Sequence, residues 1–347
     1  MPPQFVIRAV RPTKADGQIW LTNSTNFQFI MSDRRRINGP SGGTNAPVFS
    51  KYLTKDSKNR PERPSRSRQP NVLRKIFLKT GVTPSASGSA YLELEPSQPS
   101  NESAPGLTSL STSGLKLTCT VHGPRPLPKA APFSPHMILQ THVKYAPFAA
   151  RRRRGYVRDT SERDLGVHLE TALRGVIIGD RWPKSGVEVN ITILEGEEDH
   201  WWGDDKSFGS LTAGGWGMMS VLSGCITVAS AAIADAGIDC VDVVSGGVAA
   251  LVRSPANSEQ EGSTSLVLDP VPSEHKEILA ACIVAYLPAR DEITDLWVKG
   301  DIGHSTESST DDPSYEELTE NAVQAALGAH RVLIGALKET ADIKFRR

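Results

Sequence analysis

The chain has 347 residues, 38% of them hydrophobic, so it is long enough to build a sizeable core in one large domain or two smaller ones. Its 39 Lys and Arg residues balance 39 Asp and Glu residues, which argues against a freely diffusing nucleic-acid-binding protein, because that class carries a basic excess. We therefore expect any RNA contact on a local patch, and the low net charge favours a stable assembly.

Cysteine usage and hydropathy narrow the class of protein further. The four cysteines show no metal-binding spacing, and three of them lie in apolar runs: Cys119, Cys225, Cys240 and Cys282. This pattern predicts reduced, buried thiols in an intracellular protein, without a disulfide framework or a metal site. No apolar run reaches membrane-spanning length and the first residues lack the order of a signal peptide, so we expect no membrane partner.

The first 70 residues are rich in Pro, Gly, Ser and Arg and cannot bury enough apolar surface to order themselves. We expect residues 1–70 to form a largely disordered or extended arm laid over a partner. Met31 resembles a natural start of translation, so residues 1–30 are interpreted as an upstream extension. Residues 71–347 are predicted to form a single domain with flexible insertions at about 94–113, 200–217 and 254–263.

The first predicted elements of the domain are strands. A short stretch rich in apolar residues leads into a strand at 88–93, and 116–121 forms the returning strand of a hairpin with a long polar loop. A further strand is expected at 142–145, shortly before a run of four arginines at 151–154.

A helix–turn–strand unit follows at 159–195. Thr160 or Asp159 can cap a helix whose apolar residues recur at three- and four-residue steps, namely Leu165, Leu169, Ala172, Leu173 and Val176. Gly179 and Pro183 end this helix. Apolar and polar side chains then alternate along 187–193, which predicts a strand with one buried face.

The second half of the chain contains a helix of small residues at 220–236, which can pack closely against a sheet. Strands are expected at 241–252, 266–268, 279–287 and 293–298, and an amphipathic helix is expected at 315–338. This order of strands and helices predicts an α+β fold, in which mixed sheets carry helices packed on one side.

Four motifs in this order resemble the ribonuclease PH family. They are Gly88–Glu93 paired with Lys116–Arg125, then Glu162–Gly166, Trp182–Ser185 and Ala234–Ile238. The resemblance covers roughly residues 70 to 340. It implies a single-domain β-α-β-α fold of the ribosomal protein S5 domain 2-like type.

Active relatives use phosphate to attack the terminal linkage of RNA, with an arginine from a G-G-T-R-type loop that opens the small-residue helix and an aspartate from a later strand. Here the loop corresponds to Met219–Leu222 or, alternatively, to Gly214–Gly217, and neither contains an arginine. The aspartate position falls on Ala281, whose methyl group can neither bind a metal nor accept a proton. We therefore expect a catalytically inactive homologue with no catalytic residue, metal or cofactor.

An inactive subunit of this family implies a place in the eukaryotic RNA exosome, a six-membered ring around an RNA channel. The expected role is structural, supporting 3′-to-5′ RNA processing and degradation. The resemblance implies as partners the other ribonuclease PH-like ring subunits, RNA-binding cap subunits, an associated hydrolytic ribonuclease and RNA in the channel. It also implies a location in the nucleus, nucleolus and cytoplasm.

The arginine run is the best candidate RNA-binding set: Arg151, Arg152, Arg153 and Arg154. Arginine binds phosphate in a sequence-independent way, although a basic run can equally be a solvated loop. Arg125 is a lesser candidate, with a surface salt bridge as the alternative interpretation. The acidic stretch 195–199 is interpreted as a solvated turn rather than a metal cluster, and His275 as an exposed loop residue.

Two alternatives remain open from the sequence. An active phosphate-dependent 3′-exoribonuclease would need catalytic groups at unexpected positions, for example Asp269 or Asp291 with Arg253. An α/β binding protein unrelated to the family would lack the β-α-β-α core.

Overall fold

The computed structural model describes residues 63–64, 66–96, 114–150, 154–157, 159–199, 215–253, 264–302 and 314–346. The elements in the first half are β1 (Ile76–Thr80), β2 (Gly88–Leu94), β3 (Lys116–Pro126), β4 (Ile138–Tyr145), α1 (Thr160–Arg174), the 3-10 turn η3 (Gly179–Arg181) and β5 (Ser185–Glu195). Those in the second half are α2 (Trp216–Asp235), β6 (Ser245–Arg253), β7 (Thr264–Leu268), β8 (Ile278–Leu287), β9 (Glu292–Gly300) and α3 (Tyr315–Phe345).

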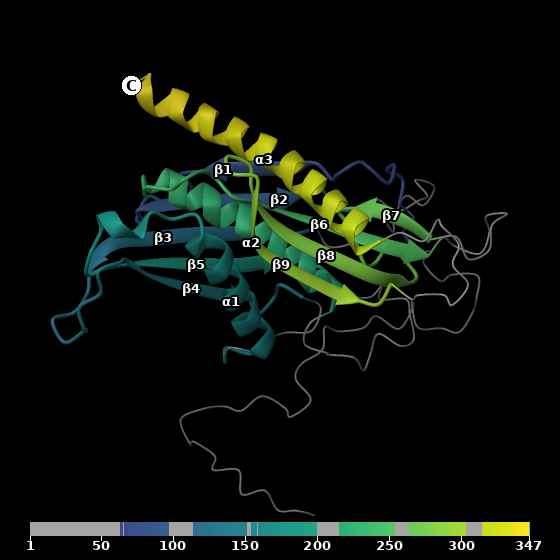
Figure 1. Cartoon of the computed structure of the whole chain (residues 1–347), viewed down its shortest axis with the longest axis horizontal. Coiled ribbons are helices and arrows are strands. Elements are labelled where there is room, and N and C mark those ends of the chain that lie inside the picture. The colour runs from purple at the N-terminus through teal and green to yellow at the C-terminus, as the bar shows by residue number, and fades with distance from the viewer. Residues whose placement is uncertain are drawn as a thin grey trace, which may run out of the picture. The chain divides into compact units, whose positions relative to one another are not determined.

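The first half forms a five-stranded sheet in the order β1-β2-β3-β5-β4 (Figure 1). Strand β4 runs parallel to β5, and the other neighbours are antiparallel, so this sheet is mixed. Residues alternate between buried and half-buried along β3 and β5, as a strand with one core face requires. The buried face packs against α2, which also contacts the second sheet.

The second half forms an antiparallel sheet in the order β7-β6-β8-β9, with α2 against one face and α3 against the other. Two adjacent glycines of β6 show both contacts, because neighbouring strand residues face opposite sides. A Cβ atom on Gly246 would lie 2.5 Å from the Ser223 carbonyl oxygen of α2, and one on Gly247 would lie 2.2 Å from the Ala322 carbonyl oxygen of α3. The expectation of helices on one side only is therefore wrong for this sheet.

Helix α2 begins at Trp216, four residues before the predicted start at Ser220. Its length and composition would suit a membrane-spanning helix, contrary to the expectation that no apolar stretch reaches that size. However, 89% of that stretch is buried inside the fold, because α2 packs between the two sheets. Small side chains along the helix allow this close approach.

The predicted α+β class is confirmed. Strand β1 is an additional element, and Val241–Val244 precede β6 rather than belonging to it. The predicted inner face of α3 is buried at Leu318, Ala322, Ala325, Ala326, Ala329 and Leu333. Residues 97–113, 200–214 and 254–263, which contain most of the predicted insertions, lie outside the described residues, as do residues 1–62 of the predicted arm.

The described end of the predicted arm lies against the segment that follows β7. The Arg66 guanidinium donates hydrogen bonds to the carbonyl oxygens of Gln69, Pro70, Val72, Leu268 and Asp269, at 3.0–3.3 Å. Arg68 pairs with Asp269 at 3.3 Å and with Glu274 at 3.1 Å. Two arginines thus hold this extended segment against residues 268–274.

Candidate functional site

Two motif acids that carry the family resemblance have structural roles. The carboxylate of Glu162, at the start of α1, accepts hydrogen bonds from the backbone N–H groups of Tyr145 (3.0 Å) and Asp159 (3.1 Å), and from Lys144 Nζ (2.9 Å). Asp235, at the end of α2, accepts hydrogen bonds from Ser89 N at 3.0 Å and Lys344 Nζ at 2.6 Å. These residues join helices to the first sheet rather than serving chemistry.

Helix α2 begins at Trp216, so both possible positions of the catalytic loop, 214–217 and Met219–Leu222, lie at or near its first turn. The family arginine would fall on Gly217 or on Leu222, and neither residue is basic. The Gly217 N–H donates a hydrogen bond to Asp199 Oδ1 at 2.9 Å. A Cβ atom on Gly215 would lie 1.8 Å from the Asp199 carboxyl carbon. A carboxylate of the chain therefore occupies the position at the helix N-terminus that suits a bound anion.

The second catalytic position is also altered. Ala281, where active relatives carry an aspartate, lies on β8 with 2% of its surface exposed. It pairs with Ala250 of β6 and Lys299 of β9. The Lys299 ammonium lies 4.8 Å from the centroid of the Trp216 ring, so a cation–π contact occupies this region. Neither the arginine nor the aspartate of active relatives is present at these two described positions.

The acidic stretch after β5 is not a solvated turn, so that expectation is wrong for Glu197. The Glu197 side chain is 2% exposed and pairs with Arg74, which also binds both carboxylate oxygens of Asp269 at 2.7 Å. Burial alone would raise the pKa of Asp269, but the charge and hydrogen bonds of Arg74 outweigh it and hold that pKa well below its usual range. The pKa of Glu197 is raised, because burial outweighs the attraction of Arg74.

The residues considered for an active enzyme do not meet in the described structure. The backbone N–H of Asp269 donates a hydrogen bond to the Val248 carbonyl oxygen. Val248 lies five residues before Arg253 on β6, so about 17 Å of strand separates Asp269 from Arg253. Arg253 pairs with Glu277 at 2.8 Å, beside the start of β8. Asp291 lies in the turn after the far end of β8, about 30 Å from Glu277. Three scattered groups cannot share one substrate.

His275 differs from its expected exposed position. It is half-buried, and Arg63 donates a hydrogen bond to its carbonyl oxygen at 2.6 Å. Burial lowers the pKa of His275 to about 4, with neighbouring arginines acting in the same direction. Its imidazole is therefore neutral at physiological pH and unsuited to hold phosphate by charge.

The structure places one member of the arginine run, because Arg151, Arg152 and Arg153 lie outside the described residues. The Arg154 guanidinium lies 3.8 Å from the centroid of the Tyr145 ring and donates a hydrogen bond to Ser161 Oγ at 3.4 Å. Its side chain is 27% exposed. Arg154 therefore packs against the fold and presents only part of its guanidinium to solvent.

Arg125 lies at the opposite end of the first sheet from Arg154. It is exposed at the end of β3, where it pairs with Gly186, the partner of Ile138 at the start of β4. Tyr145, which carries Arg154, is seven residues further along β4, or about 23 Å. The two candidate RNA contacts therefore do not form one site.

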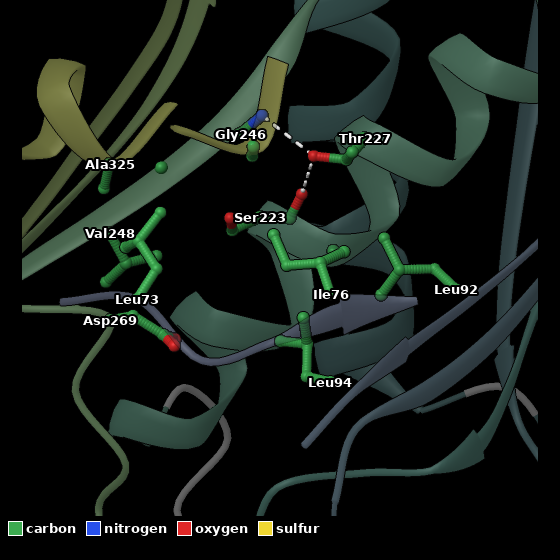
Figure 2. A pocket seen from close by; sticks show the side chains of 13 residues that line it. Leu73, Ile76, Leu92, Leu94, Ser223, Thr227, Gly246, Val248, Asp269 and Ala325 are labelled. Atoms are coloured by element: carbon green, nitrogen blue, oxygen red, sulfur yellow. Dashed lines mark hydrogen bonds between the residues drawn. The ribbon is translucent and has the colours of Figure 1, made fainter. Parts of the chain in front are cut away.

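A small cavity lies where the two sheets meet, beneath α2 and α3 (Figure 2). Its volume is about 40 Å³, and its lining is mainly apolar, including Leu73, Ile76, Leu92, Leu94 and Val248. On one wall, Thr227 Oγ1 accepts a hydrogen bond from Gly246 N and donates one to the Ser223 carbonyl oxygen, as Figure 2 shows. This volume suits a water molecule rather than a substrate.

Within the described ranges, no group of three His, Cys, Asp or Glu side chains could hold a metal ion. The four cysteines are free thiols, and three are buried. Burial raises the pKa of Cys282 to about 12, so this thiol is unreactive.

Comparisons with known proteins identify the family of this chain. Residues 72–239 match the 3′ exoribonuclease family, domain 1 (RNase PH). The chain is 57% identical over 310 residues to exosome complex component MTR3 of Chaetomium thermophilum, covering 89% of this chain and 99% of that protein. It is 28% identical over 288 residues to exosome complex component MTR3 of Homo sapiens, covering 80% and 86%.

A solved structure shows the same fold. The crystal structure of rice (Oryza sativa) Rrp46 superposes with a TM-score of 0.54 at 15% identity, covering 78% of this chain and 98% of that one. The segments Asp33–Pro40 and Gly88–Tyr91 also resemble the mRNA-transport-regulator subunit of the exosome. The similarity to MTR3 proteins confirms that prediction, although Asp33–Pro40 lies outside the described residues.

Proposed function

Because the chain belongs to the RNase PH family of 3′ exoribonucleases, we propose that it is a non-catalytic structural subunit of an RNA exosome ring. In this role it supports 3′-to-5′ RNA processing and degradation by lining or scaffolding the RNA channel. Relatives from Chaetomium thermophilum, Schizosaccharomyces pombe and Homo sapiens carry the name exosome complex component, and the match spans 99% of the first of these proteins.

The observation that carries the loss of catalysis is the start of α2. Phosphorolysis needs an anion-binding position for the attacking phosphate and a positive group to stabilise it. Here Asp199 accepts the Gly217 N–H bond, so a negative side chain takes the place at the N-terminus of α2 where a phosphate could otherwise be held. Repulsion between the two anions adds to the missing arginine, since neither Gly217 nor Leu222 is basic, and to the missing aspartate at Ala281.

The proposal includes the partners that such a role requires. These are the other RNase PH-like ring subunits, RNA-binding cap subunits, an associated hydrolytic ribonuclease, and RNA held in part by Arg151–Arg154. The proposed location is the nucleus, nucleolus and cytoplasm, for which the basic N-terminal segment is compatible with nuclear import.

An RNA-shortening assay tests the loss of catalysis. The purified chain is incubated with a 3′-labelled single-stranded RNA, phosphate and Mg²⁺, beside an active phosphorolytic member of the family as a positive control. We expect no release of nucleoside diphosphates. Phosphate-dependent release that disappears in Arg253→Gln, but not in Arg331→Gln, would establish the rival activity and overturn the proposal.

A further inference from the structure

The described part of the N-terminal segment reaches β1 by way of residues 268–275, which lie at and after the end of β7. We call residues 63–70, described at 63–64 and 66–70, the strap, and residues 268–275 its docking segment. We infer that the strap is a latch with a closed and an open state, and that the closed state supports the first turns of α2. The latch is a property of the chain's own conformation and does not depend on the proposed scaffold role.

Two arginines of the strap bind backbone oxygens of the docking segment. Arg63 donates a hydrogen bond to the His275 carbonyl oxygen at 2.6 Å. Arg66 donates to the carbonyl oxygens of Leu268 at 3.0 Å and Asp269 at 3.3 Å. Burial lowers the pKa of Arg66 to about 10, so its guanidinium stays charged at physiological pH. The planar fork of this guanidinium reaches several oxygens at once, which an ammonium group could not do.

Glu274 of the docking segment is the residue that controls the latch. Its side chain is 3% exposed and accepts a hydrogen bond from Arg68 of the strap at 3.1 Å. Arg68 also pairs with Asp269 at 3.3 Å. Because water screens these charges only weakly, the pair should hold the strap more strongly than an ion pair on the exposed surface would. Neutralising Glu274 should therefore favour the open state.

The docking segment has a backbone conformation at Asp269 that needs support from its neighbours. The φ of Asp269 is 49°, in the left-handed region, which is uncommon for a residue other than glycine. Its carboxylate is bound by Arg68 from the strap and by Arg74 from the residues that lead to β1. Opening the strap removes the first of these contacts. Arg74, together with Leu73, which lines the small cavity beside Asp269 in Figure 2, keeps the chain anchored.

The residue after Asp269 contacts α2 directly. Ser220, in the second turn of α2 and 2% exposed, donates its hydroxyl to the Pro270 carbonyl oxygen at 3.2 Å. Since Asp269 and Pro270 are consecutive, the backbone angles of Asp269 determine where the Pro270 carbonyl lies. Opening the strap should therefore weaken the Ser220 hydrogen bond and let the first turns of α2 unfold locally more often.

A brief trypsin digestion of the full chain measures the open state. Trypsin cleaves after Arg66 and Arg68, neither of which precedes proline, and it needs a segment that is detached from the fold. Mass spectrometry of the products separates these two cleavages from all others. Glu274→Gln should speed both about tenfold to a hundredfold, as expected for the loss of a charged hydrogen bond. The matched control is Glu277→Gln, which removes an exposed carboxylate and should leave both rates unchanged.

Hydrogen exchange of the same proteins measures the coupling to α2. In Glu274→Gln the amides of residues 216–221 should exchange about twofold to thirtyfold faster than in the wild type. In a Ser220→Ala background the same substitution should have a much smaller effect, because the hydrogen bond that links the docking segment to α2 is absent. Arg66→Lys is a second way to open the strap and should change both readouts in the same direction, so a folding defect in Glu274→Gln leaves the test intact. Circular dichroism confirms that each variant is folded.

Three results would overturn the inference. Unchanged cleavage after residues 66 and 68 in both Glu274→Gln and Arg66→Lys would exclude the latch. Faster cleavage without faster exchange at 216–221 would exclude its coupling to α2. An equal response to Glu277→Gln would assign the effect to a general loss of negative charge. Both readouts use the purified chain, so the latch and the scaffold role can fail separately.

Discussion

Replacing Arg74 by methionine should unfold much of the chain, because it removes the cation that pairs with buried Glu197 and, among the described residues, leaves Asp269 with Arg68 alone. The side chains of Arg74 and Glu197 are each 2% exposed, and that of Asp269 is 16% exposed. Removing one partner of a buried ion pair costs about 3–5 kcal/mol. Glu197 can instead take up a proton, which at pH 7 costs about 4 kcal/mol for a carboxyl with an unfolded pKa of about 4.3. Both estimates predict that the free energy of unfolding falls by about 4 kcal/mol.

The pH dependence of stability gives this prediction a specific signature. In the Arg74→Met protein the folded-state pKa of Glu197 should exceed its unfolded value, so the folded state binds more protons. Its stability should then rise as the pH falls from about 8 to 6, by up to about 1.4 kcal/mol per pH unit. In the wild type the lowered pKa of Asp269 has the opposite effect on stability. The stabilisation from the Asp269 carboxylate is present above its unfolded pKa and is lost as the pH falls toward its folded pKa.

Urea unfolding followed by circular dichroism measures the free energy of unfolding and, when repeated at several pH values, its pH dependence. Arg253→Met is the matched control, because Arg253 and Glu277 form an exposed pair, 48% and 50% accessible, and its loss should cost less than about 1 kcal/mol. The reasoning is refuted if Arg74→Met costs no more than the control. It is refuted equally if the two variants show the same pH dependence.

Three further perturbations test other parts of the fold. Glu162→Ala removes a buried carboxylate that accepts three hydrogen bonds, so the free energy of unfolding in urea should fall by about 2–3 kcal/mol, and an unchanged midpoint would remove its structural role. Gly247→Ala places a methyl group 2.2 Å from an α3 carbonyl oxygen and should lower the free energy of unfolding by about 1–3 kcal/mol. Gly335→Ala adds a methyl group with no atom within 4 Å and should raise the free energy of unfolding by about 0.4–1 kcal/mol. Calorimetry that ranks these two variants in reverse order would contradict the packing. The hydrogen bond from His168 to Asp295 raises the pKa of His168, so its stabilisation is present below the unfolded pKa of 6.5 and is lost as pH rises through the folded pKa. An NMR titration of His168 should therefore move to lower pH in Asp295→Asn, and an unmoved titration would exclude this pairing.

Local periodicity was sufficient to predict most elements of the fold. The alternation in 187–193 predicted the central part of β5, and the apolar spacing from Leu318 to Leu333 predicted the buried face of α3. Strand β1 was not predicted as a separate strand, because five residues provide too few alternations to separate it from the preceding apolar stretch. The start of α2 was misplaced because Gly215 and Gly217 are poor helix residues, and Asp199, which binds the first turn, is 18 residues away from Gly217.

The candidate site depended more on distant contacts, which no local pattern reveals. Arg74 binds Asp269 across 195 residues, and only folding shows that Asp269 is committed to this pair rather than available for catalysis. The expected loss of the catalytic arginine and aspartate did not need the fold, because it followed from comparing the motifs of this sequence with those of active relatives. Arg125 and Arg154 lie at opposite ends of the first sheet, and this separation depends on strand pairing that no local pattern reveals.

The most direct test of the central claim is a tagged pull-down of this chain from its source cells at high salt, followed by mass spectrometry. A non-catalytic ring subunit predicts stoichiometric recovery of several other RNase PH-like chains, together with cap subunits and a hydrolytic ribonuclease. Recovery of the chain alone, or only with copies of itself, would contradict the scaffold role.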